Sequence, residues 1–404
     1  MNILYFGSYC DKEWFSKVID KSKSPFQVAQ YSFEEALING FNMLNDINLD
    51  LNYIFLENYY PKGQFLYIKK QKKEIEKKLM LTYIPIINLP ILKEIYMVFQ
   101  GFLFTSKWAI NNHKNNKKII LTSFNYTPFA LGTYLASKVF KCKRVNIFTD
   151  LSSDVLNRRK KNMSFVKRLI LPIYKRIIRF IERSYDGYIL FTEPMNEIVN
   201  PLDKPYIIIE GIYNNNLDLT DVPKRSAVMY AGTLAFDYGV KSIIDAFKSI
   251  NSDDLELWLF GDGDMKDYII EQCEQDNNIK YFGFRPRDEV FYYEKKASVL
   301  INVRNPKDLY TKYSFPSKTF EYLVSGTPFI STKLKGIPEE YYNYIFTVNS
   351  TDTEEIKNKI EEILAMKRSE LIKRGLKARK FILREKTSEV QIEKIIKFIN
   401  CKIL

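Results

Sequence analysis

Residues 313–330 read Tyr313-Ser-Phe-Pro-Ser-Lys318-Thr-Phe-Glu321-Tyr-Leu-Val-Ser-Gly326-Thr-Pro-Phe-Ile330. The stretch predicts a helix that begins at Pro316, because proline suits the first helical turn and Ser317 can cap the free N–H groups. The apolar side chains of this helix recur on one face, and Gly326 should end it before a strand begins near Pro328. A helix that leads directly into an apolar strand indicates an α/β fold.

The same alternation extends along the chain. Short apolar runs bounded by turn residues predict strands at residues 3–6, 119–122, 145–148, 187–191, 206–209, 227–231, 255–260, 279–282, 299–303, 328–331 and 344–347. Longer stretches of helical period lie between them. This pattern is typical of consecutive βα units in a mostly parallel sheet.

The length of the chain, 404 residues, exceeds what one hydrophobic core usually supports. Glycine, asparagine and proline interrupt the pattern between residues 210 and 225, where a domain boundary is expected. We therefore expect two Rossmann-like, doubly wound domains, residues 1–212 and 213–385, that face a central cleft. Residues 386–404 should form a C-terminal helix that packs back on the N-terminal domain.

The net charge indicates the kind of partner, and the cysteine spacing bears on disulfides and metal sites. The 61 Lys and Arg residues outnumber the 48 Asp and Glu residues, which gives a net charge of +13. This excess favours an anionic partner: nucleic acid, an acidic membrane surface or a phosphorylated substrate. The cysteines are far apart in the sequence and form no Cys-x-x-Cys pair, so neither a disulfide framework nor a zinc site is expected.

The chain begins with a strand-like segment that lacks the pattern of a signal peptide. Prolines and charged residues interrupt its most apolar stretch, residues 79–108, so no run is long enough to span a bilayer. We therefore expect a cytoplasmic protein without a transmembrane helix.

Several strands of the second domain end in turns that suit phosphate. These turns lie within residues 228–234, 257–264, 281–284 and 300–304. In doubly wound sheets, ligands bind beyond the carboxyl ends of the strands, where helix N-termini favour anions. Gly232, Gly261 and Gly263 would let the backbone approach a diphosphate closely. One such turn is common in any α/β protein, whereas a series of them indicates a nucleotide site.

Lys318 and Glu321 lie in the first turn of the helix quoted above. A carboxylate at this position can accept hydrogen bonds from two hydroxyl groups of a ribose. Lys318 and the positive end of the helix dipole can face phosphate oxygens. The two residues therefore predict a nucleotide diphosphate ligand.

Four motifs follow one another in the second half: Tyr230-Ala-Gly-Thr-Leu, Gly261-Asp-Gly, Ile301-Asn-Val-Arg and Ser314-Phe-Pro-Ser-Lys-Thr-Phe-Glu-Tyr-Leu. With them the chain resembles the family-4 retaining glycosyltransferases of GT-B fold, particularly bacterial capsular and exopolysaccharide enzymes. The resemblance implies that Glu321 is the ribose-binding second acid of the family's E-x7-E motif. It also implies that the backbone around Phe284 and Arg285 meets the base.

The donor-binding residues expected from the turns and from this resemblance form one set. They are Gly7, Ser8, Gly232, Thr233, Tyr238, Gly261, Gly263, Phe284, Arg285, Ser314, Phe315, Pro316, Ser317 and Glu321. By the same resemblance, the N-terminal domain binds the acceptor and the C-terminal domain binds the nucleotide sugar.

The chain departs from the family pattern at two places. Tyr313 stands where the first acid of E-x7-E is usual, and Thr233 and Tyr238 stand roughly where the family carries its diphosphate-binding Arg and Lys. We expect a metal-independent site without a cofactor, in which Arg304 and Lys318 stabilise the charge of the leaving phosphate. Asp262-Gly-Asp264 remains open to an alternative interpretation as a metal-binding D-x-D motif.

In the first half, Gly7 and Ser8 follow the first strand and are expected to contact the donor, although an ordinary turn explains them equally well. Asp150 follows another strand, near a position where similar enzymes carry an acidic residue or histidine. Asp150 is the expected catalytic carboxylate, with a helix-cap role as the alternative. The single histidine, His113, lies in a polar stretch and is expected to be exposed.

Residues 158–183 combine basic and apolar residues at helical spacing. The basic residues expected to meet the membrane or acceptor are Arg158, Arg159, Lys160, Lys161, Lys167 and Arg168. A basic amphipathic helix suits an anionic inner-leaflet surface. The alternative is a solvated helix that packs its apolar side inward.

Together these features predict transfer of a sugar from a nucleotide diphosphate donor, with UDP the expected nucleotide and retention implied by the resemblance. The expected acceptor is a polyprenyl-diphosphate-linked saccharide at the inner face of the plasma membrane, used in synthesis of capsule, exopolysaccharide or O-antigen. The alternatives are a nucleotide-sugar epimerase of the same fold and a non-catalytic partner subunit. Nucleic-acid binding is a further alternative that no recognition motif supports.

Overall fold

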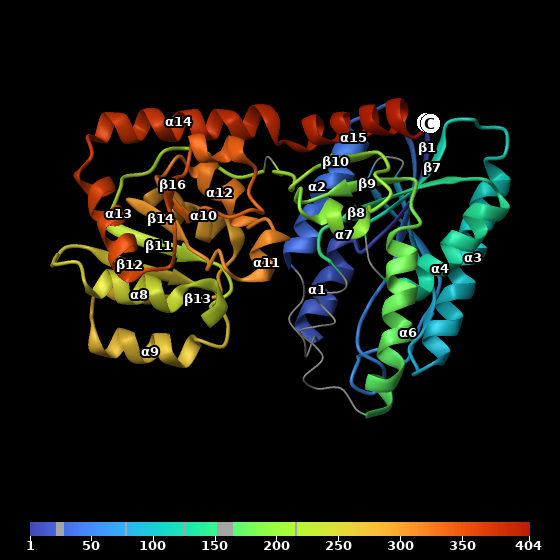
Figure 1. Cartoon of the computed structure of the whole chain (residues 1–404), viewed down its shortest axis with the longest axis horizontal. Coiled ribbons are helices and arrows are strands. Elements are labelled where there is room, and N and C mark those ends of the chain that lie inside the picture. The colour runs from blue at the N-terminus through green and yellow to red at the C-terminus, as the bar shows by residue number, and fades with distance from the viewer. Residues whose placement is uncertain (22–27, 77–78, 124–125, 152–164, 215) are drawn as a thin grey trace. The chain divides into compact units, whose positions relative to one another are not determined.

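The computed structural model describes residues 1–21, 28–76, 79–123, 126–151, 165–214 and 216–404 (Figure 1). The chain divides into two units. One unit contains Met1–Ile212 together with Ser388–Leu404, and the other contains Tyr213–Thr387. The C-terminal helix therefore belongs to the same unit as the N-terminus.

The N-terminal unit is built on a sheet with the strand order β10-β9-β8-β7-β1-β2-β5-β4. Its strands are β1 (Asn2–Gly7), β2 (Asn48–Tyr53), β4 (Gln71–Glu76), β5 (Leu79–Tyr83), β7 (Lys118–Thr122), β8 (Lys143–Phe148), β9 (Gly187–Leu190) and β10 (Tyr206–Ile208). Neighbouring strands are parallel except for the pair β4 and β5. A separate antiparallel ribbon joins β3 (Tyr67–Ile68) to β6 (Ile86–Ile87).

Helices cover this sheet. They are α1 (Lys12–Lys21), α2 (Val28–Asn42), α3 (Leu92–Asn111), α4 (Thr127–Val139), α6 (Phe165–Glu182), α7 (Met195–Val199) and α15 (Ser388–Lys402). The chain returns to this unit as α15, which packs against α2, where a Cβ at Gly40 would lie 2.4 Å from the Ile392 side chain. Figure 1 shows α3, α4 and α6 next to one another in this unit. No helix in the described part of the chain combines the length and apolarity needed to cross a membrane.

Helices α3 and α4 approach each other more closely than side chains would allow. A Cβ atom at Gly132 of α4 would lie 1.9 Å from the Val98 carbonyl oxygen, and one at Gly101 of α3 would lie 2.3 Å from the Phe129 carbonyl oxygen. Two glycines therefore let backbone pack directly on backbone.

The C-terminal unit contains a wholly parallel sheet with the strand order β13-β12-β11-β14-β15-β16. Its strands are β11 (Ala227–Ala231), β12 (Glu256–Phe260), β13 (Ile279–Gly283), β14 (Val299–Asn302), β15 (Phe329–Thr332) and β16 (Phe346–Val348). The α-helices are α8 (Val240–Lys248), α9 (Lys266–Gln275), α10 (Arg287–Lys296), α11 (Leu309–Lys312), α12 (Lys318–Ser325), α13 (Thr353–Ala365) and α14 (Arg368–Glu385). Numbered from β11, this is the strand order of a Rossmann fold.

The expected α/β fold of two Rossmann-like units is confirmed, and each strand expected from an apolar run exists within two residues of its expected bounds. Five strands, β2 to β6, were missed. The interior strand β2 alternates Asn and Asp with Leu, and β4 is mostly charged, so neither presents an apolar run. The apolar stretch at residues 79–108 contains β5, β6 and most of α3.

Replacement of Gly132 tests the close packing of α3 on α4. We expect Gly132→Val to lower the free energy of unfolding of the N-terminal unit by about 3 kcal/mol, because the new side chain must push two backbones apart. Denaturant unfolding followed by circular dichroism measures this change. Lys138→Val places the same residue at an exposed site of α4 and should change the free energy by about 0.5 kcal/mol or less. Equal effects of the two substitutions would show that the contact is not tight.

Candidate functional site

The order of the strands in the C-terminal sheet reverses between β11 and β14. Loops that leave neighbouring strands at such a point run in opposite directions and open a crevice beyond the carboxyl ends, where α/β proteins bind ligands. The loop after β11 leads to Gly239, which has a φ of 73° and immediately precedes α8. A Cβ there would lie 2.2 Å from the Val303 carbonyl oxygen, so the loops after β11 and β14 touch. The free N–H groups at the start of α8 thus belong to this crevice.

The glycine-rich loops after β11 and β12 interlock. Gly232 N–H donates to the Phe260 carbonyl at 3.0 Å, and Leu234 N–H donates to the Asp262 carbonyl at 3.0 Å. Gly261 has a φ of 130°, and a Cβ there would lie 1.8 Å from the Gly232 carbonyl oxygen. Contact between the loops therefore requires glycine at position 261. The sequence alone does not reveal this requirement.

Arg304 follows β14 at the crevice. Its Cζ lies 4.6 Å from the centroid of the Tyr238 ring. Its backbone is fixed by Thr332, whose hydroxyl accepts from Arg304 N–H at 3.0 Å and donates to the Arg304 carbonyl at 2.7 Å. The Nε atom is buried without a hydrogen-bond partner, and no carboxylate among the described residues pairs with the guanidinium. An uncompensated cation at a crevice of this kind favours an anionic ligand.

Glu321 lies in the first turn of α12 and is bound by two cations. Arg287, at the start of α10, donates from Nε to Glu321 Oε1 at 2.7 Å. Lys318 Nζ donates to Glu321 Oε2 and, at 3.0 Å, to Oε1 of the fully buried Glu294 on α10. These contacts join α10 to α12 and fix the orientation of the Glu321 carboxylate.

The two carboxyl groups of this cluster differ in protonation. Burial raises the pKa of Glu294 to about 8, and its Oε2 atom has no hydrogen-bond partner. Burial alone would also raise the pKa of Glu321, but the charges of Lys318 and Arg287 outweigh it and hold that pKa below the ordinary value. At neutral pH the cluster therefore contains two cations and one ionised carboxylate, an excess of positive charge that suits a diphosphate.

The helix at the quoted stretch follows the sequence expectation at one end and departs from it at the other. Gly326 ends α12 with a φ of 76°, as predicted. Ser317 precedes the helix, but its side chain makes no capping hydrogen bond, so the capping prediction is wrong. The turn is instead closed by Thr319 N–H, which donates to the Pro316 carbonyl at 2.9 Å.

The other expected donor-site residues differ in how far their side chains are exposed to solvent. Phe284 follows β13 with 74% of its side chain exposed, while the neighbouring Arg285 donates from Nε to the Phe282 carbonyl at 2.9 Å. Thr233 is exposed, and its carbonyl accepts from the Tyr230 hydroxyl at 2.8 Å. The Phe315 ring packs in the core, and Pro316 beside it is buried. Of these residues, Phe284 presents the largest open surface to a planar ligand.

The structure also places Ser314, Tyr313 and the two aspartates of the alternative metal-binding motif. Ser314 has a buried hydroxyl without a partner, whereas Tyr313, in place of the family's acid, lies near Lys312 with a ring-to-ammonium distance of 5.3 Å. Asp262 and Asp264 are exposed. Within the described ranges, no group of three or more His, Cys, Asp or Glu side chains is arranged to hold a metal ion.

The N-terminal sheet has its own reversal of strand order, between β1 and β7. There the buried carboxylate of Glu34, from α2, accepts from Ser8 N–H and Ser8 Oγ at 2.7 Å each, from Tyr9 N–H at 2.8 Å and from Ser123 Oγ at 2.8 Å. A Cβ at Gly7 would lie 2.3 Å from Glu34 Oε2. The groups of Ser8 that were expected to meet the donor are thus bonded to Glu34.

The remaining expected residues lie in the N-terminal unit. Asp150 is exposed two residues beyond β8. Arg158, Arg159, Lys160 and Lys161 lie outside the described residues, as do the side chains of Lys167 and Arg168 in α6. The structure thus describes neither the contacts nor the direction of those six basic side chains.

Arg287, Glu294 and Glu34 were not identified from the sequence. Arg287 and Glu294 are seven residues apart on α10, a spacing that places both on one face of a helix, and this signal could have linked them. Their partners on α12 lie 34 and 24 residues further along the chain. Glu34 has no comparable signal, because its partners follow two distant strands.

The protonation of Glu294 predicts a dependence of stability on pH. The unfolded chain has a glutamate pKa near 4.5 and the folded chain a raised pKa of about 8 at this site, so folding is favoured while Glu294 is protonated. This contribution is lost as the pH rises from the lower to the higher value. Glu294→Gln, which stays neutral, should lose less stability than the wild type across this range in denaturant unfolding. Parallel pH profiles for the two proteins would contradict the assignment.

Comparison with known proteins agrees with this geometry. Residues 219–401 match the family model described as Glycosyl transferases group 1. None of the curated proteins compared with the chain matches it.

Solved structures show the fold of the whole chain. The crystal structure of Anabaena Alr3699/HepE in complex with UDP covers 98% of this chain and 100% of that chain, at 14% identity and a TM-score of 0.61. Sucrose-phosphate synthase (tll1590) from Thermosynechococcus elongatus covers 99% of each chain, at 15% identity and a TM-score of 0.61. The lipopolysaccharide outer core galactosyltransferase WaaB covers 100% of each chain, at 13% identity and a TM-score of 0.61. The chain therefore has the GT-B fold of these structures, and its residues 219–401 match the group 1 glycosyltransferases.

Proposed function

We propose that the enzyme transfers a sugar from a UDP-sugar whose ribose is bound by Glu321. The observation that carries this proposal is the ionised carboxylate in the first turn of α12, oriented by Arg287 and Lys318. An anionic carboxylate can accept a hydrogen bond from each of two ribose hydroxyls. A similar fold binds UDP in the Anabaena protein, which supports this nucleotide.

The diphosphate and the base are assigned to the neighbouring groups. The guanidinium of Arg304, which lacks a carboxylate partner among the described residues, and the N-terminus of α8 bind the diphosphate. The exposed ring of Phe284 and the backbone at Arg285 receive the uracil. The backbone of the loops around Gly232, Gly261 and Gly263 lines the nucleotide.

The proposed reaction does not use a metal ion. Arg304 stabilises the negative charge that develops on the departing diphosphate. A phosphate oxygen of the leaving group takes the proton of the attacking hydroxyl, and the transferred sugar keeps its anomeric configuration. Asp150 remains the proposed carboxylate near the transferred sugar, although it lies in the N-terminal unit.

Lys318 acts in this proposal through Glu321. Its ammonium donates hydrogen bonds to both Glu294 and Glu321, so its donors are directed at these two side chains and not at a ligand. The sequence expectation of a direct phosphate contact is therefore replaced by a positioning role: Lys318 keeps Glu321 ionised and oriented for the ribose.

The proposed acceptor is a polyprenyl-diphosphate-linked saccharide in surface polysaccharide synthesis, such as that of capsule, exopolysaccharide or O-antigen. The net charge of +13 suits a diphosphate-bearing lipid at an anionic membrane. The similarity in fold to a lipopolysaccharide outer core galactosyltransferase supports the same class of pathway. The enzyme would work as a peripheral protein on the inner face of the plasma membrane.

Transfer itself is tested by incubation of the purified enzyme with UDP-sugars, with and without a lipid extract that contains polyprenyl-linked saccharides. We expect sugar to appear in the lipid fraction only when both substrates are present. Formation of an epimerised UDP-sugar without lipid would show an epimerase instead. Tight UDP binding without any turnover would indicate a non-catalytic subunit.

The role of Glu321 predicts a specific loss of ribose recognition. Glu321→Gln should weaken UDP binding about tenfold or more, because hydrogen bonds to a charged group contribute about 1.5–3 kcal/mol. It should also abolish the preference of the wild type for UDP over 2′-deoxy-UDP in isothermal titration calorimetry. Glu274→Gln, at an exposed carboxylate of α9, is the control and should leave both affinities unchanged. Retained discrimination between the two nucleotides in Glu321→Gln would place the ribose elsewhere.

The role of Arg304 predicts a loss that depends on phosphate. Arg304→Gln should weaken UDP binding about tenfold or more and leave uridine binding unchanged, since the guanidinium meets only the diphosphate. Lys307→Gln removes an exposed cation from the same loop and serves as the control. Equal losses for uridine and UDP would assign Arg304 to the nucleoside and contradict the proposed phosphate contact.

A further inference from the structure

Helix α3 has its apolar face turned outward. The residues it buries are Lys93, Met97, Gln100, Gly101, Thr105, Ser106, Trp108 and Ala109, most of which are small or polar. The residues it exposes include Leu92, Ile95, Phe99, Leu103 and Ile110. Their spacing of three, four, four and seven positions places them on one stripe along the helix. A helix that packs polar residues inward and exposes an apolar stripe needs a partner for that stripe.

Helix α6 repeats this arrangement. Ile173, Ile177 and Phe180 are exposed at spacings of four and three, while Leu171, Ile178 and Ile181 face the protein interior. Arg176, Arg179 and Arg183 are exposed beside the apolar stripe. The helix is thus apolar toward the core, and its outer surface is part apolar and part basic.

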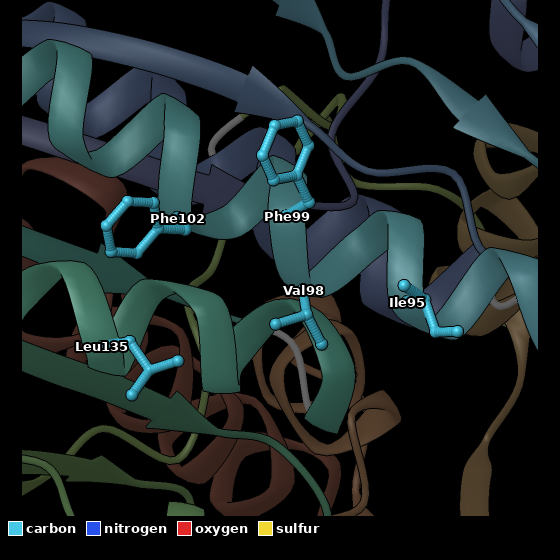
Figure 2. Close-up of a pocket in the computed structure, with 5 residues that line it drawn as sticks. All are labelled: Ile95, Val98, Phe99, Phe102 and Leu135. Atoms are coloured by element: carbon cyan, nitrogen blue, oxygen red, sulfur yellow. The ribbon is translucent and has the colours of Figure 1, made fainter.

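Helix α4, which contacts both α3 and α6, adds Leu135 and Val139 to the exposed apolar surface. Between α3 and α4 a shallow pocket is lined by Ile95, Val98, Phe99, Phe102 and Leu135, as Figure 2 shows. All five side chains are hydrocarbon. We call the exposed surfaces of α3, α4 and α6 together the three-helix face.

The charges at the three-helix face have one sign. Its exposed charged residues among the described side chains are Lys107, Lys138, Arg176, Arg179 and Arg183. Of the acidic residues in these helices, Glu182 is buried, and Glu94 is half-buried and accepts a hydrogen bond from Tyr59. None of the three arginines has a carboxylate partner within the described residues. The face is therefore apolar and basic together.

We propose that the three-helix face docks on an anionic lipid bilayer, with its apolar stripes in the headgroup region and its arginines on lipid phosphates. Interfacial helices bind membranes by burial of an apolar face and attraction of flanking cations to anionic lipid. A second copy of the chain fits poorly, because it would bring the same cations together. This inference rests on the proposed lipid-linked acceptor and adds residues outside the basic segment expected from the sequence. It places the N-terminal unit at the surface where such an acceptor would lie.

Co-sedimentation with vesicles tests the apolar stripes. The wild type should bind vesicles of equal parts phosphatidylglycerol and phosphatidylcholine, and bind phosphatidylcholine alone weakly. The double variant Phe99→Glu/Ile173→Glu, at side chains that are 54% and 61% exposed, should lower the partition coefficient at least about tenfold. Leu376→Glu, at a side chain that is 56% exposed in the other unit, is the matched control and should bind as the wild type does.

The arginines are tested in the same assay. Each of Arg176→Gln, Arg179→Gln and Arg183→Gln should lower the partition into anionic vesicles about fivefold at low salt. Arg384→Gln, at an exposed arginine of α14, should have no effect. Added salt should weaken vesicle binding by the wild type more than vesicle binding by the triple variant Arg176→Gln/Arg179→Gln/Arg183→Gln.

Several results would overturn the inference. Wild-type vesicle binding by Phe99→Glu/Ile173→Glu would show that the face does not meet lipid. A dimer in analytical ultracentrifugation that the double variant dissociates would assign the face to a second copy. UDP affinity, measured for each variant, separates the two proposals. If the wild type bound UDP but not vesicles, only the membrane inference would be contradicted. If it bound vesicles but not UDP, only the proposed function would be contradicted.

Discussion

The ion pairs of Glu321 with Arg287 and Lys318 are the interaction on which the candidate site depends. They join α10, which follows β13, to α12, which precedes β15, and they hold an ionised carboxylate in the first turn of α12. Glu294, fully buried behind Lys318, binds the ammonium and takes up a proton at neutral pH. The cluster can therefore orient Glu321 toward a ligand without neutralising its own positive excess.

The two Rossmann-like units differ in the groups that lie at the point where the strand order reverses. In the C-terminal unit, close contact among the loops of Gly232, Gly239 and Gly261 leaves backbone and the Arg304 cation at the crevice. In the N-terminal unit, the Glu34 carboxylate already binds the N–H groups after β1. A carboxyl group of the protein itself thus fills the place where a Rossmann fold could hold a phosphate, which leaves the nucleotide to the other unit.

The elements that the sequence predicted best are those marked by a local pattern, such as an apolar run or a glycine at a helix end. The central C-terminal strands β11, β12 and β14 are mostly apolar, and Gly326 ends α12 in a left-handed conformation that glycine adopts readily. Strand β2 was missed because it lacks an apolar run. Its polar side chains bond to distant segments, as Asn52 does to the Tyr5 carbonyl and Asp50 to the Trp108 indole N–H. The pairing of Arg287 with Glu321 and of Glu34 with Ser8 depends on tertiary packing between distant segments, which no local pattern contains.

A crystal structure of the protein with UDP tests the central claim most directly, because the ribose either meets Glu321 or does not. The account predicts both ribose hydroxyls within hydrogen-bond distance of the Glu321 carboxylate, with Arg287 and Lys318 still bound to it. It also predicts the diphosphate at Arg304 and the start of α8. A ribose bound away from α12, with Glu321 still closed within its ion pairs, would contradict it.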